Sequence, residues 1–184
     1  RMKDMDKVNF RKYVTIFFAF IFMFLIFTPI SKPLSIYKEK IAYDNNEFFE
    51  LPDPLELDMS LEEAICRRMS VREFTGEAIS NEELSTILWH AYGLIQEDFR
   101  SINSITNEYP ITIYVLADSG VWRYIPEDHN LIKYRCFDMT WIGQYDAAAV
   151  KIGLAWDKNK CVNENYAAAE IGEICQNIYF TCNA

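Results

Sequence analysis

Three arginines and a serine hydroxyl lie within the six-residue segment Arg67-Arg68-Met69-Ser70-Val71-Arg72. A guanidinium can bind a phosphate through two parallel hydrogen bonds, and a hydroxyl can donate a third. This combination of residue types suits a phosphate group. The alternative is a set of solvated charges at a helix end, where the helix dipole favours cations. That alternative suits Arg67, whereas Arg68, Ser70 and Arg72 fit an anion site better as a set.

A polar stretch about thirty residues later, Asn103 to Pro110, runs straight into an apolar segment. Its Asn107 offers an amide donor and an amide acceptor, the pair needed to read the edge of a planar heterocycle. Ser104 adds a hydroxyl to the same loop. Together the two segments predict a site for a phosphorylated cofactor that carries a ring.

Two further stretches follow in the chain, Gly120 to Leu131 (GVWRYIPEDHNL) and Glu173 to Ala184 (EICQNIYFTCNA). Taken in order, the four pieces resemble the FMN-dependent nitroreductase family. The third and fourth are similar to the branch of SagB-type dehydrogenases. The resemblance covers roughly residues 60–184. An R-x-S-x-R pattern alone is a weak signal, but four pieces in the family's order are specific.

The resemblance implies a role for each candidate site residue. Arg68, Ser70 and Arg72 would face FMN, with Arg72 near the N1/O2 edge of the flavin. Asn107 would read the flavin ring, and Ser104 opens the same loop. A fixed cation near that edge stabilises the negative charge of reduced flavin and so raises its reduction potential.

The function that the resemblance implies is hydride transfer from NAD(P)H or a substrate, through FMN, to a small-molecule acceptor. The family also implies a homodimer with flavin at the interface. Because the flavin carries the chemistry, we assign no catalytic acid or base, and we expect His90 and His129 to be structural. One alternative is a degenerate, non-catalytic flavin-fold module acting as a membrane-anchored interaction protein. Another is reductive dehalogenation of the iodotyrosine deiodinase type, for which we see no lid motif.

The chain departs from the family pattern in two places. Asn103 to Glu108 replaces the small-residue loop of the SagB-type branch, which argues against azole formation. Family domains also continue past the last helix into a glycine-rich loop, whereas this sequence stops at Ala184. We therefore expect a domain that is C-terminally incomplete.

Charge and cysteine content exclude other classes of function. The net charge of −9 argues against nucleic-acid binding, which needs a basic surface. The five cysteines form no C-x-x-C pair, so we predict no metal site and expect reduced, buried thiols that pack as small apolar residues.

Capping and periodicity predict the elements that carry these residues. Ser60 and Ser80 each open a capping box ahead of a helix, and Gly93 ends the second helix. Strands are expected at Ile111–Ala117 and Ala148–Trp156, a hairpin at Gly120–Tyr134, and a last helix capped by Asn163. Helices among mostly non-parallel strands predict an α+β layered fold.

The N-terminal part divides by composition into a basic segment, 1–12, an uncharged stretch, 13–31, and a linker, 32–58, ahead of the domain at 59–184. The uncharged stretch spans about 28 Å as a helix, so it predicts a single-pass membrane anchor. A cleavable signal peptide is the alternative. Five basic residues before the stretch and three after it favour a domain outside the cytoplasm.

Overall fold

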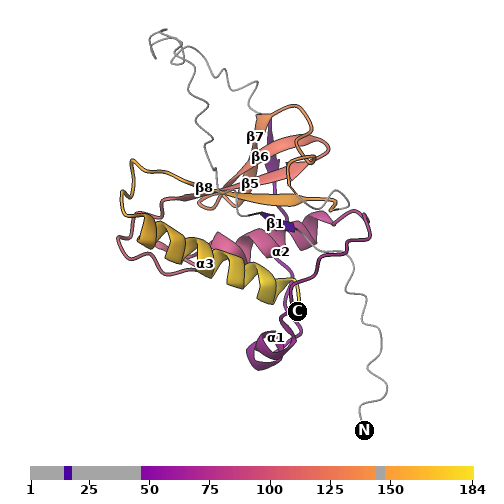
Figure 1. Ribbon diagram of the computed structural model, residues 1–184, viewed down its shortest axis with the longest axis horizontal. Helices are drawn as coiled ribbons and strands as arrows, with labels where there is room; N and C mark the ends of the chain where they lie inside the picture. Colours follow the sequence, from indigo (N-terminus) through magenta and orange to yellow (C-terminus); the bar gives the residue numbers. More distant parts are fainter. Residues whose placement is uncertain (1–14, 18–46, 144–147) are drawn as a thin grey trace, which may run out of the picture.

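The computed structural model describes residues 15–17, 47–143 and 148–184. In this part of the chain a six-stranded sheet has two long helices on one face, α2 (Asn81–Tyr92) and α3 (Glu164–Thr181) (Figure 1). The short helix α1 (Leu61–Arg67) lies away from the sheet and contacts α3. This is the α+β layered arrangement that the sequence predicts.

The strand order of the sheet is β1-β8-β5-β6-β7-β2. Its strands are β1 (Thr15–Phe17), β2 (Phe48–Glu50), β5 (Ile111–Ala117), β6 (Gly120–Ile125), β7 (Asn130–Arg135) and β8 (Lys151–Trp156). Neighbouring strands are antiparallel except β1 and β8. A separate hairpin of β3 (Leu94–Gln96) and β4 (Phe99–Arg100) follows α2. The sequence does not predict this hairpin, because its strands are too short to show an alternating pattern.

The core fills the space between the helices and one face of the sheet. Along β5 the side chains of Ile111, Ile113 and Val115 are buried, in the alternation expected of a strand with one covered face. They join one apolar cluster with Leu88 of α2 and Ile178 of α3. The apolar face of α3 that carries Ile178 therefore packs on the sheet.

Local signals place the helix ends correctly. Ser80 and Glu83 form the complete capping box at the start of α2, and Ser60 accepts a hydrogen bond from the Glu63 N–H at the start of α1. Asn163 caps α3. Gly93 ends α2 without a left-handed backbone. It is required there because a Cβ would lie 2.5 Å from the carbonyl oxygen of Trp89.

The predicted membrane helix, 13–31, lies outside the described residues except for Thr15–Phe17. Those three residues are extended and pair with β8, which suits the strand propensity of threonine, isoleucine and phenylalanine. Where the chain is described, no helix is long and apolar enough to cross a membrane.

The predicted linker, 32–58, contributes to the folded unit. Its residues Phe48–Glu50 form β2, which pairs with β7. Leu51 is buried in the core, and the Leu55 N–H donates to the Thr86 hydroxyl of α2 at 2.8 Å. The described end of this segment is therefore attached to both layers.

The cysteines correct one sequence expectation. All five are free, but only Cys161 and Cys175 are buried, while Cys182 is partly buried. Cys66 and Cys136 are exposed, so they do not pack as core residues. Cys66 lies on the outer side of α1, a helix whose buried residue is Ala64.

Candidate functional site

The arginine segment begins at the C-terminus of α1. Arg68 is the capping residue, since its backbone N–H donates to the carbonyl oxygen of Ala64. Its guanidinium carbon lies 5.7 Å from the centroid of the Tyr179 ring in α3, at cation–π distance. Ser70 and Arg72 follow on the surface, where a guanidinium nitrogen of Arg72 lies 3.5 Å from the carbonyl oxygen of Ser70. Arg68, Ser70 and Arg72 therefore lie along one segment without regular secondary structure, in which Arg68 is half-buried and the other two residues are exposed.

Arg67 differs from its neighbours. Its side chain is exposed and forms an i,i+4 ion pair with Glu63 on the surface of α1. The sequence predicts this surface role for Arg67. An Arg67 variant is therefore a suitable control for variants of Arg68 and Arg72.

The second predicted segment forms a tight loop between β4 and β5. Asn107 has φ 55° and Tyr109 has φ 47°. Both angles lie in the left-handed region that residues other than glycine rarely adopt. The Asn107 N–H lies 3.3 Å from the Ser104 carbonyl oxygen, and the Tyr109 N–H lies 3.4 Å from the Ser104 hydroxyl. The loop presents the exposed Asn107 side chain to solvent.

The base of the loop is tied to the domain by aromatic and ionic contacts. The Arg100 guanidinium lies 4.3 Å from the centroid of the Tyr92 ring and 4.9 Å from that of Tyr109. It also pairs with Glu127 at 2.6 Å. Burial raises the pKa of the Tyr92 hydroxyl, so this phenol stays neutral. Arg100 therefore links the start of the loop to Tyr109 at its end.

Helix α3 contacts both predicted segments, but at different places. The Ser104 hydroxyl donates to Glu170, and Arg68 lies over Tyr179. Nine residues of helix separate these contacts, about 14 Å along the axis and about half a turn around it. The two segments therefore contact opposite faces of α3.

A polar network beneath the hairpin turn was not predicted. His129 Nε2 lies 2.7 Å from the Ser85 hydroxyl, and His129 Nδ1 lies 2.9 Å from the Tyr124 hydroxyl. Ser85 is fully buried and donates to the carbonyl oxygen of Pro52, so it is not placed to attack a substrate. Tyr124 and His129 of the hairpin motif therefore have a structural role in this network.

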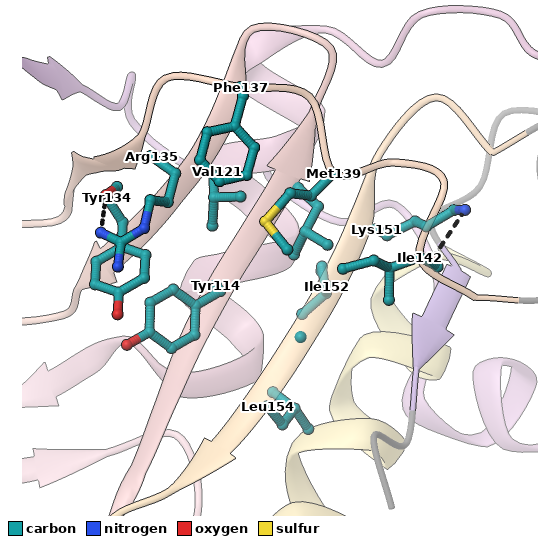
Figure 2. Close-up of a pocket in the computed structure, with 12 residues that line it drawn as sticks. Tyr114, Val121, Tyr134, Arg135, Phe137, Met139, Ile142, Lys151, Ile152 and Leu154 are labelled. Atoms are coloured by element: carbon teal, nitrogen blue, oxygen red, sulfur yellow. Dashed lines mark hydrogen bonds between the residues drawn. The ribbon is translucent and has the colours of Figure 1, made fainter. Parts of the chain in front are cut away.

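An apolar groove of about 480 Å³ lies on the sheet face opposite the helices (Figure 2). Tyr114, Val121, Phe137, Met139 and Leu154 are among the residues that line it. The ammonium of Lys151 points toward the carbonyl oxygens of Thr140 and Ile142 instead of into the groove. None of the predicted cofactor residues lines this groove, so it is not the predicted site.

No family model matches the chain, but individual proteins of known family resemble it. A protein of Methanocaldococcus jannaschii named as a nitroreductase is 31% identical over 153 residues, which covers 71% of this chain and 75% of that protein. A crystal structure from Ralstonia eutropha, also named as a nitroreductase, superposes with a TM-score of 0.66 at 27% identity. The superposition covers 73% of this chain and 70% of that structure.

The layered α+β domain is of the kind found in nitroreductases. The chain belongs to the nitroreductase family, a family of oxidoreductases. The expectation drawn from the four sequence pieces is confirmed at this level.

Proposed function

We propose that the chain is an FMN-dependent oxidoreductase of the nitroreductase type. The observation that carries the proposal is the segment Arg68–Arg72, which holds two guanidiniums and a hydroxyl within five residues of an otherwise acidic chain. The chemistry of these donors fits a phosphate. The exposed Asn107 amide, held in a left-handed conformation, fits the edge of a flavin ring.

Each residue has a defined task in this proposal. Ser70 and one guanidinium bind the cofactor phosphate, and Arg72 supplies a cation that favours the reduced, anionic form of the ring. Bound FMN would supply hydride transfer from NAD(P)H or a substrate to a small-molecule acceptor. No side chain of the protein has to act as a nucleophile.

Flavin retention tests the proposal. The full chain, purified in mild detergent, is mixed with FMN, desalted, and examined by visible absorbance. We expect retained flavin bands that bleach with NAD(P)H. Arg72→Ala should raise the Kd for FMN about tenfold or more, because it removes a charged hydrogen-bond donor. Arg67→Ala is the matched control and should retain FMN. Equal retention in both variants would exclude the arginine assignment.

The positions of the two segments favour a site shared between two copies of the chain. We infer that one cofactor is reached by the arginine segment of one copy and the amide loop of another, since the two segments contact opposite faces of α3. Leu61, Ile65 and Met69 add exposed apolar surface beside the arginine segment. Large exposed apolar groups in a row are typical of an interface. We infer a homodimer that completes two sites.

Complementation tests the shared site. Arg72→Ala and Asn107→Ala chains are each expected to lose FMN. When they are unfolded together and refolded at equal amounts, half of the dimers would be mixed, and each mixed dimer would carry one intact site. Flavin retention should then recover to about a quarter of the wild-type value. No recovery in a dimer would mean that each site lies within a single chain.

Membrane attachment and the SagB-type branch remain part of the proposal. Outside Thr15–Phe17, which pair with β8, the uncharged stretch 13–31 still predicts a membrane anchor, so the full chain should sediment with membranes after a high-salt wash. The hairpin motif supports the SagB-type branch, and the loop at Asn103–Glu108 argues against azole formation by it. Assaying NAD(P)H-dependent reduction of nitroaromatic compounds against oxidation of azoline peptides would separate the two activities.

A further inference from the structure

Three side chains of α3 hold the amide-bearing loop from below. Glu170 accepts a hydrogen bond from the Ser104 hydroxyl at 2.6 Å, and Glu173 accepts one from the Asn103 N–H at 2.8 Å. The Asn177 amide donates to the Ser101 carbonyl oxygen at 3.2 Å. Positions 170, 173 and 177 share one helix face, so the loop lies along a row of polar groups that faces it.

Glu170 differs from the other two because it is buried. Its residue is 1% exposed, and its second carboxylate oxygen has no hydrogen-bond partner among the described residues. Burial raises the pKa of this carboxyl, while the hydrogen bond from Ser104 and the charge of Arg100 act in the opposite direction. Arg100 itself forms an ion pair with Glu127. A carboxylate in such a place is costly, so the contact that it makes with Ser104 needs an explanation.

Ser104 is the residue through which this contact acts. Its carbonyl oxygen accepts from the Asn107 N–H, and its hydroxyl oxygen accepts from the Tyr109 N–H. Both Asn107 and Tyr109 have left-handed backbones, which cost free energy unless the surrounding structure holds them. Ser104 therefore braces the loop at Asn107 and at Tyr109, and Glu170 anchors the brace to α3.

We propose that Glu170 is a positioning residue of the cofactor site, which holds the Ser104 hydroxyl and thereby the turn that presents Asn107. This inference rests on the proposed flavin site. It assigns Ser104, which the family resemblance places beside the flavin, to the support of the loop. The sequence alone shows Glu170 as one more carboxylate on an acidic helix.

Loop order and flavin affinity together test the proposal in the full-length protein. Amide hydrogen exchange of residues 104–109, followed by mass spectrometry, reports the brace without any flavin. Glu170→Ala and Ser104→Ala should each raise this exchange rate and raise the Kd for FMN about tenfold. The double variant should be no worse than either single variant, because both remove the same interaction. Glu170→Gln retains an acceptor oxygen and should return the Kd to within a few fold of wild type.

Ile174→Val is the control for a loss of stability alone. Ile174 lies in the core on the same helix and is fully buried, so its variant should lower the melting temperature and leave both loop exchange and Kd unchanged. Unchanged loop exchange in Glu170→Ala, or additive effects in the double variant, would overturn the proposal. If the wild type binds no FMN, raised loop exchange in Glu170→Ala still supports the brace while the proposed function fails.

Discussion

Ser85 of α2 and His129 of the β6–β7 turn lie 44 positions apart in the sequence, and their side chains meet at 2.7 Å. Because the Ser85 hydroxyl donates to the Pro52 carbonyl oxygen, it must accept from His129 Nε2–H. His129 Nδ1 is then left to accept from the Tyr124 hydroxyl at 2.9 Å. Neutral imidazole satisfies every member of this chain, and it ties the segment after β2 to both layers.

The first prediction concerns pH. Burial lowers the pKa of His129 below its ordinary value of 6.5. A hydrogen bond to the backbone of Pro52 and the charge of Asp53 act in the opposite direction. The unfolded chain therefore binds more protons than the folded chain once the pH falls below about 6.5. The contribution of this group to stability is fully present above that pH and is lost as the pH falls. Urea unfolding at pH 7.5 and at pH 5.5 should show a lower free energy of unfolding at the acidic pH.

Two histidine variants assign the effect. His129→Gln carries no titrating ring, so it should reduce the difference between the two pH values. His90→Gln should retain the difference, because the His90 ring bonds to the Thr86 carbonyl oxygen of its own helix and takes no part in the hydrogen bonds among Ser85, His129 and Tyr124. An equal loss of the pH dependence in both variants would contradict the assignment to His129.

The second prediction compares two glycines. Gly172 lies on the exposed side of α3, and a Cβ there would meet nothing within 4 Å. Gly172→Ala should stabilise the protein by about 0.5–1 kcal/mol, because alanine favours a helix interior. Gly120 has φ +127°, and a Cβ there would lie 2.3 Å from the Arg135 carbonyl oxygen. Gly120→Ala should destabilise by more than about 1 kcal/mol. Thermal unfolding of the pair measures both signs.

The third prediction compares two helix caps. Ser80→Ala removes the capping box of α2, a helix in the core, and should lower the free energy of unfolding by about 1 kcal/mol. Ser60→Ala removes the cap of α1, which touches the rest of the domain mainly through α3. Its cost should stay local, as faster amide exchange in residues 61–67 with a small change in global stability. Equal global losses would show that α1 unfolds together with the core.

The fourth prediction concerns thiol reactivity. Cys66 and Cys136 are exposed, whereas Cys175 is buried and its pKa is raised to about 11 by desolvation. Since the thiolate is the reactive form, a thiol reagent at pH 7.5 should label Cys66 and Cys136 first in the native protein. All five should react after unfolding in urea. Fast labelling of Cys175 in the folded protein would contradict the burial of α3.

The elements of this protein follow from local signals in the sequence. Ser80 with Glu83, Asn163 before the last helix, and the β-branched run Ile111–Ala117 each act within a few residues. Caps and side-chain alternation depend on near neighbours in the chain, so they can be recognised without knowing the fold. The residue types of the two candidate cofactor segments, Arg67–Arg72 and Asn103–Pro110, can be recognised in the same way. The family resemblance then suggested a role for each residue.

Only the tertiary structure decided which of these residues meet. The burial of Glu170 and its contact with Ser104 depend on a loop 66 positions away folding over α3. The placement of Arg68 against Tyr179, on the other side of that helix, depends on how α1 packs. Such contacts leave no periodic trace in the sequence, because the free energy that selects them comes from burial between distant segments. The sequence determined the residue types of the candidate site, and packing determined which face of α3 each segment contacts.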